Sequence, residues 1–174
     1  LASRRMRFDT EITLTGPVRS PKQMLDDQLY DGHTSVHDEA TAAKLGLAGA
    51  PIEGPTHFSQ FDPLAVALWG DDWFARGCIS AHFQTMVVEG EQVQASITTT
   101  GPTAARIEAH KADGTPVLTG TATIGPDQPT ELDTRLAELG DPGEVFIVDR
   151  LHVGMTAGDG DEASITHDER NGDL

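Results

Sequence analysis

The fold is decided by residues 79–124, which read ISAHFQTMVVEGEQVQASITTTGPTAARIEAHKADGTPVLTGTATI. Four segments in this stretch alternate polar and apolar residues or run apolar, and β-branched side chains are frequent in them, so each segment predicts a strand. The four segments are 79–88, 93–100, 105–109 and 117–124. Short turn sequences separate them, and Asp113-Gly114 is a strong hairpin signal. Four consecutive strands joined by tight turns predict an antiparallel meander.

The sequence before this stretch predicts a fifth strand and several helices. Residues 11–15 alternate and stop at Gly16-Pro17, which predicts a short strand. Short helices are predicted at residues 22–29 and 38–45, and a loop at residues 30–36.

Apolar residues at helical spacing between Phe58 and Leu68 predict one long apolar helix that ends at Gly70. Asp62-Pro63 interrupts this pattern, so proline either kinks one helix or begins a second one. We therefore expect an α+β fold in which a sheet of about five strands buries one long apolar helix.

The C-terminal part has a different character. We expect a domain over residues 1–125 and an extension over 126–155, with a short helix at 132–139 and an additional strand near 144–153. Residues 156–174 are acidic and lack large apolar anchors, which predicts a flexible tail.

Composition excludes several classes of partner. The 174 residues carry a net charge of −16, which disfavours nucleic acid and anionic membrane surfaces. The single cysteine, Cys78, forms no internal disulfide, and we interpret it as a small buried residue. The longest apolar run, 63–69, is far shorter than the roughly 20 residues of a membrane span. These features lead us to expect a cytoplasmic protein.

Several local strings resemble the MaoC-like dehydratases, a hotdog-fold family that includes the (R)-specific enoyl-CoA hydratases. The two stretches that carry most of the resemblance are ISAHFQTMVVEGEQV at 79–93 and DGTPVLTGTATI at 113–124. His37-Asp38 and Pro51-Ile52-Glu53-Gly54 stand where the family has its catalytic-loop histidine and the start of its central helix. The resemblance implies a curled antiparallel sheet wrapped around one helix, and it extends over roughly residues 11–125.

The resemblance also implies an activity, which is the addition or removal of water on an acyl thioester by a hydro-lyase. The substrate would be an acyl-CoA or an acyl-carrier thioester, no cofactor or metal would be needed, and the protein would be a homodimer or a higher oligomer. His37, Asp31 and Gly54 would be the catalytic positions, and His33, Glu53 and His57 would contact substrate.

Each of the three catalytic positions has a functional and a structural interpretation. Histidine titrates near neutral pH and suits acid–base work, but His37 also fits a helix first turn bonded to its loop. In the family's Gly-Asp-x-Asn-Pro-x-His loop the aspartate position aligns with Gly32, so Asp31 is one residue early and is equally explained as a turn residue. The Gly54 N–H could polarise a thioester carbonyl, or the glycine could serve close packing alone.

Three further points bear on function. His33 and His37 are four residues apart but lack the glutamate of a zinc-binding helix, so we expect no metal there. Glu53 replaces the family's histidine and could be the carboxylate of a hotdog acyl-CoA thioesterase. The displaced Asp31 leaves open a third possibility, a non-catalytic hotdog subunit that binds acyl groups or supports a partner.

Overall fold

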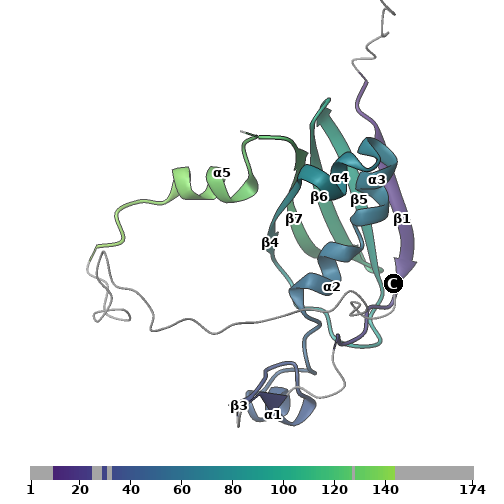
Figure 1. The fold of residues 1–174 in the computed structure, drawn as a ribbon. Helices are drawn as coiled ribbons and strands as arrows, with labels where there is room; N and C mark the ends of the chain where they lie inside the picture. The colour runs from purple at the N-terminus through teal and green to yellow at the C-terminus, as the bar shows by residue number, and fades with distance from the viewer. Residues whose placement is uncertain (1–9, 25–28, 31–32, 127, 144–174) are drawn as a thin grey trace, which may run out of the picture.

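The computed structural model describes residues 10–24, 29–30, 33–126 and 128–143 (Figure 1). Its main feature is a five-stranded antiparallel sheet in the order β1-β5-β6-β7-β4. The strands are β1 (Thr13–Arg19), β4 (Gly77–Phe83), β5 (Val93–Gly101), β6 (Ala104–Lys111) and β7 (Pro116–Ile124). The five strands predicted within residues 11–124 all exist, and the sheet is antiparallel as expected.

The predicted four-strand meander is wrong at its first strand. Only β5, β6 and β7 follow one another as neighbours, whereas β4 pairs with β7 at the far edge of the sheet. The predicted strand 79–88 ends at Phe83 because the chain then leaves the sheet edge. Ile52 N–H donates to the Val87 carbonyl over 2.8 Å, and Pro51 forms a bridge with Val88, so the residues after Phe83 pair with the loop at Pro51–Ile52 instead.

β1 does not stop at Gly16-Pro17 as the sequence predicts. The strand runs to Arg19, and its register against β5 shifts between Thr15 and Val18. Proline has no N–H to donate, but an edge strand with a bulge tolerates it because one side of the strand needs no ladder partner.

The predicted long apolar helix is two short helices, α2 (Gly54–Ser59) and α3 (Asp62–Trp69). Pro63 lies in the first turn of α3, where the missing proline N–H costs nothing. A further short helix, α4 (Asp72–Arg76), has no counterpart among the predicted elements. Trp73 Nε1 donates to Asp62 Oδ1 over 2.8 Å and so ties α4 to the start of α3.

Upstream, α1 (Glu39–Lys44) confirms the predicted helix at 38–45, and Asp38 Oδ1 accepts the Thr41 N–H at its N-terminus. The predicted helix at 22–29 is wrong in its described parts. Residues 22–24 are not helical, and Leu29 begins a two-residue strand, β2 (Leu29–Tyr30), while 25–28 lie outside the described residues. β2 pairs with β3 (His33–Thr34), inside the segment that the sequence predicts as a loop.

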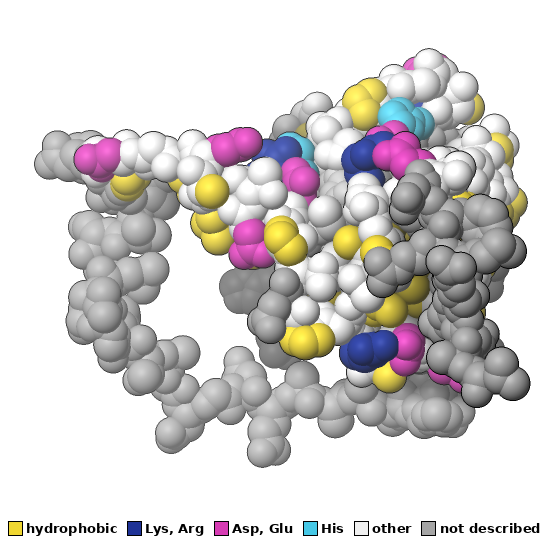
Figure 2. All heavy atoms as spheres, turned by 90° about the horizontal axis from the view of Figure 1, so that it is seen from above, with side chains coloured by type: hydrophobic (Ala, Val, Ile, Leu, Met, Phe, Trp, Pro, Cys, Tyr) yellow, Lys and Arg dark blue, Asp and Glu magenta, His cyan; other side chains and the backbone are white. Residues whose placement is uncertain are grey.

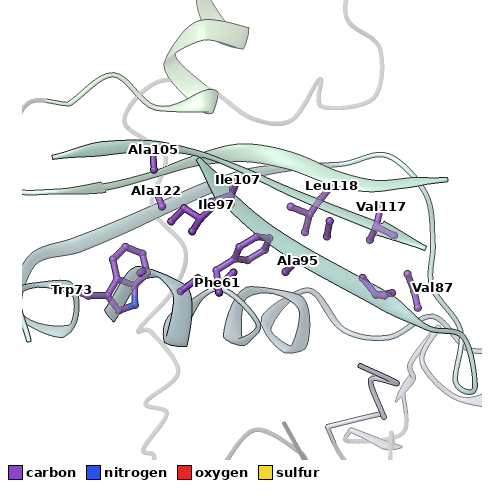
Figure 3. Close-up of a cluster of buried hydrophobic side chains, with 14 of the residues drawn as sticks. Phe61, Trp73, Val87, Ala95, Ile97, Ala105, Ile107, Val117, Leu118 and Ala122 are labelled. Atoms are coloured by element: carbon purple, nitrogen blue, oxygen red, sulfur yellow. The ribbon is translucent and has the colours of Figure 1, made fainter. Parts of the chain in front are cut away.

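The core lies between the helices and one face of the sheet (Figure 3). Phe61 is fully buried and packs with side chains from the central strands, among them Ile97, Ile107 and Leu118. The opposite face of the sheet carries mainly polar side chains, as is usual for an antiparallel sheet covered on one side. Cys78 is exposed on β4, so the prediction that it is a buried residue is wrong.

The last described element, α5 (Glu131–Glu138), confirms the predicted helix at 132–139. Its first turn lies on the polar face, where Glu131 N–H donates to Thr121 Oγ1 and Leu132 N–H donates to Ser80 Oγ, each over 3.0 Å. In Figure 2 the arm that carries α5 extends to the left, with acidic and hydrophobic side chains along it. The expected strand at 144–153 and the tail at 156–174 lie outside the described residues.

An antiparallel sheet that covers a central apolar helical segment is the α+β hotdog architecture expected from the sequence, with the central helix divided in two. None of the helices in the described part of the chain has the length and apolar character needed to span a bilayer.

Candidate functional site

The candidate site is built around the loop that leads into α2. The Pro51 carbonyl accepts two hydrogen bonds, one from His37 Nδ1 at 2.5 Å and one from Gln23 Nε2 at 3.1 Å. Ala50 N–H donates to Glu39 Oε1 over 3.2 Å. These bonds hold the loop against α1, the residue His37 before it and the segment that follows β1, so the start of α2 has a defined position.

The bond to Pro51 determines the tautomer of His37. A carbonyl oxygen can only accept, so the proton of the imidazole resides on Nδ1. In the neutral ring Nε2 then carries the lone pair and is the basic atom. His37 is half-buried, and its backbone N–H is satisfied by Ser35 Oγ at 3.2 Å. The ring is therefore oriented as a general base requires, with one nitrogen anchored and the other available for proton transfer.

Glu53 lies at the N-cap of α2 but does not cap the helix. Its side chain is 8% exposed, and Oε2 accepts the Met24 N–H over 3.0 Å. A buried carboxylate needs such donors because it has lost its hydration. The carboxylate therefore joins the chain before β2 to the start of α2.

His57 lies one turn further along α2 and is 3% exposed. Burial lowers its pKa from 6.5 to about 4, and the negative charge of Glu53 opposes that shift only in part. The ring is therefore neutral at physiological pH. His57 Nδ1 lies 3.4 Å from Gln60 Nε2, and the ring packs at 6.0 Å from that of Phe83. These contacts place the His57 ring between Gln60 and Phe83.

Gly54 is the first residue of α2 and lies under an aromatic ring. A Cβ at this position would be 3.3 Å from Cζ of Phe83, so the absence of a side chain allows the ring to approach. Phe83 is 42% exposed and also packs against Phe58, with ring centroids 5.7 Å apart. The Gly54 backbone thus stands at the edge of a small aromatic cluster made by Phe58, Phe83 and His57.

The structure brings four of the six predicted site residues into one region. Glu53, Gly54 and His57 lie together at the start of α2, and His37 is joined to the same loop through Pro51. Asp31 lies outside the described residues. The backbone of His33 pairs with Tyr30 in the β2–β3 ladder.

Two residues of this region were missed at the sequence level. Gln23 supplies hydrogen bonds to the carbonyls of Ala50 and Pro51, and Phe83 covers Gly54. No local pattern marks Gln23, because its partners are about 27 residues away in the chain. Phe83 lies inside the predicted strand 79–88, but the sequence did not indicate which helix it faces.

The described residues contain no group of three or more histidine, cysteine, aspartate or glutamate side chains placed to hold one metal ion. The groups that the structure places near the start of α2 are an oriented imidazole, a buried carboxylate and backbone N–H groups.

No protein-family model matches the chain, and no curated protein matches it. Among solved structures, it is similar to an (R)-hydratase from A. caviae involved in PHA biosynthesis. That structure is 17% identical with a TM-score of 0.44, and the match covers 71% of this chain and 100% of the other. A hot-dog-like protein from Thermanaerovibrio acidaminovorans is 18% identical with a TM-score of 0.36, over 74% of this chain and 89% of the other. The fold assignment rests on the strand order and the buried helices described above.

Proposed function

We propose that this chain is a hydro-lyase that adds water to, or removes it from, an α,β-unsaturated acyl thioester. The observation that carries the proposal is the bond from His37 Nδ1 to the Pro51 carbonyl. It leaves Nε2 as the basic atom of an oriented imidazole and connects that imidazole to the loop that ends at Gly54. The proposal also rests on the resemblance to MaoC-like dehydratases in the sequence.

In the proposed reaction His37 Nε2 accepts a proton from water while the hydroxide oxygen bonds to the β carbon of the substrate. The electrons of the carbon–carbon double bond move toward the thioester carbonyl, whose oxygen gains negative charge. A backbone N–H at Gly54 would stabilise that oxygen. The protonated His37 then gives its Nε2 proton to the α carbon, which completes the addition and restores the neutral imidazole. Asp31 would share the reacting water with His37. Dehydration is the same sequence in reverse.

A non-catalytic hotdog subunit is the second candidate, and the contact between Phe83 and Gly54 favours it. The Phe83 ring lies 3.3 Å from the position that a Gly54 Cβ would occupy, so it takes up space beside the start of α2 that an acyl group would need. The thioesterase alternative is less well supported, since Glu53 is buried and its Oε2 is engaged by Met24. A carboxylate nucleophile or base has to reach the thioester carbon or a water beside it.

We also propose the substrate carrier, the oligomeric state, the cellular location and the domain bounds of the enzyme. The acyl group would be carried by CoA or by an acyl carrier protein, and the protein would act as a homodimer or higher oligomer in the cytoplasm. His33 is a proposed substrate contact. Glu53 and His57 would act on the substrate only through the loop and helix that they hold. The domain would occupy residues 1–125, with 126–155 as an extension and 156–174 as a tail.

One assay separates these functions. The protein is incubated with a short trans-2-enoyl-CoA and, separately, with the saturated acyl-CoA of equal length. A hydratase consumes the first, with loss of the conjugated absorbance and formation of a 3-hydroxyacyl-CoA, and leaves the second unchanged. Release of free CoA from the saturated compound would instead support the thioesterase. Absence of both reactions would support the non-catalytic subunit.

A further inference from the structure

The helix α5 has an apolar side that the described residues leave open. Leu132, Leu136 and Leu139 follow one another at intervals of four and three residues, which places them on one side of the helix. They are 58%, 54% and 71% exposed, and no residue of α5 is buried. The first turn is held on the polar face of the sheet by the hydrogen bonds from the Glu131 and Leu132 N–H groups. The helix is therefore anchored at its start, and its apolar side is uncovered.

A helix as short as α5 needs a packing partner. It has eight residues, whereas isolated helices shorter than about 12–15 residues are marginal in water. The capping box between Thr130 and Asp133 and the ion pair between Arg135 and Glu131 stabilise the helix, but they leave the three leucines exposed. Most of the stability of a helix in a protein comes from the packing of its apolar side. The exposed leucines therefore indicate that a further segment covers them.

The sequence shortly after α5 contains an apolar run of matching length. Residues 145–148 read VFIV, and Leu151 and Val153 follow them. Four residues in an extended conformation span about 10 Å, which is also the length of helix from Leu132 to Leu139. The run lies outside the described residues, so its assignment to α5 rests on its sequence and on its place in the chain.

The connection between α5 and this run is long enough for the run to return along the helix. Residues 140–144 separate Leu139 from Val145, and a chain of that length reaches up to about 20 Å. Within the connection Gly143 has a φ of +65°, and its N–H donates to Asp141 Oδ1 over 2.9 Å. A glycine in the left-handed region and an aspartate bonded to the backbone two residues on are both typical of turns. The connection therefore contains a turn directly after α5 and keeps the run within reach of the leucines.

Charge favours this run over a second copy of α5 as the covering segment. α5 carries three acidic side chains against one arginine, a net charge of −2, so two such helices packed together repel each other. Residues 145–153 carry one aspartate and one arginine and bring no net charge to the helix. The short connection also gives the run a high effective concentration at α5, which a segment of another molecule lacks.

We propose that the leucine side of α5 is a docking surface for this chain's own residues 145–148, which pack against Leu132, Leu136 and Leu139. The helix and the run then form one unit, anchored where the first turn of α5 bonds to Thr121 and Ser80. In this unit the apolar side of α5 is removed from water and is closed to other proteins. The proposal goes beyond the proposed hydratase activity and does not depend on it.

Hydrogen exchange of the α5 backbone amides in the full chain tests the proposal. The double variant Phe146→Asp/Ile147→Asp puts a charge on both sides of an extended run, so the side that faces α5 is changed in either orientation. We expect this variant to speed the exchange of α5 by about tenfold or more, because the uncovered helix is marginal. Ala163→Asp/Ser164→Asp adds the same charge further along the chain and should leave the exchange of α5 unchanged. Unchanged exchange in the first variant, or an equal effect of the two, would overturn the proposal.

Disulfide trapping tests whether the covering segment belongs to the same chain. On a Cys78→Ser background, which removes the native thiol, Leu136→Cys is combined with Phe146→Cys or with Ile147→Cys and oxidised. We expect at least one of these pairs to form a disulfide within one chain, about tenfold faster than the matching pair with Ala137→Cys, which lies on the other side of α5. A disulfide between two chains would assign the leucines to a second copy, and equal rates from Leu136 and Ala137 would show that the run does not rest on them. Either result would overturn the proposal, as would the absence of a disulfide in both Leu136 pairs.

Discussion

At the scale of single residues, buried His57 makes the stability of the protein depend on pH. Its pKa falls from 6.5 in an exposed histidine to about 4 in the fold, because burial disfavours the charged ring. Between these two values the unfolded chain binds a proton that the folded chain does not. The free energy of unfolding is therefore highest above pH 6.5 and decreases as the pH falls toward 4.

Urea denaturation at about pH 7.5 and about pH 5 measures this loss, which we expect to be on the order of 2 kcal/mol for the wild type. The variant His57→Gln cannot take up the proton, so its difference between the two pH values should be smaller by that amount. An equal pH dependence in the two proteins would show that His57 is not held neutral by the fold.

From residue type and position, the sequence predicts four site residues that the structure places near the start of α2, namely His37, Glu53, Gly54 and His57. The sequence could not predict that Glu53 accepts the Met24 N–H or that the Phe83 ring lies beside Gly54. Both contacts join residues about 29 positions apart in the chain, and no local periodicity encodes such a pairing. Only the folded chain shows which candidate residues are occupied by structural contacts.

At the scale of elements, the junction between β4 and β7 depends on a glycine. A Cβ at Gly120 would lie 2.1 Å from the Ser80 carbonyl oxygen and 2.8 Å from Ala81 Cα. Both neighbours are backbone atoms, so β4 would have to move away. We expect Gly120→Ala to lower the free energy of unfolding by at least about 2 kcal/mol in a denaturation experiment.

Gly101 provides the matched control, because it lies at the end of β5 and no atom comes within 4 Å of the position that a Cβ would occupy there. Gly101→Ala should change the free energy of unfolding by less than about 0.5 kcal/mol. Similar effects of the two substitutions would mean that the approach of β4 to Gly120 is not as close as described.

The elements themselves were predictable where a local period or a turn signal was strong. The alternation of polar and apolar residues in β5, β6 and β7, together with the Asp113-Gly114 turn, predicts that these three strands pair in sequence as two successive hairpins. The place of β4 was not predictable, since the segment after Phe83 pairs with the distant loop at Pro51–Ile52 rather than turning back. Likewise, the Asp62-Pro63 pair is compatible with one kinked helix or with two separate helices. The structure has two helices, and Phe61, which lies between α2 and α3, is buried in the core.

At the scale of the whole molecule, the two edges of the sheet differ in their protection. β1 carries Pro17, Arg19 and a bulge, all of which oppose pairing with another strand. β4 contains no proline, lysine, arginine, aspartate or glutamate in Gly77–Phe83. An unprotected edge of this kind favours association, so we predict that the protein is at least a dimer and that β4 lies at the interface.

Light scattering at micromolar concentration should therefore return at least twice the 18.6 kDa mass of one chain. Cys78→Lys places a charge on the exposed surface of β4 and should shift the protein toward the monomer. Thr15→Lys, exposed on β1, should leave the mass unchanged. The mass of a single chain for the wild type would refute the predicted oligomer, and equal behaviour of the two variants would refute the role of β4.

If His37 is the acid–base group of an acyl thioester hydratase, its replacement must slow the hydration of a short trans-2-enoyl-CoA. We expect His37→Asn to lower that rate by about 10²–10⁴-fold, the usual effect of losing such a group. Asp31→Asn should cost as much if the two residues share the water, and the double variant should then be little worse than either single one. A rate for His37→Asn equal to that of the wild type would show that His37 is not this acid–base group, whatever the effect at Asp31.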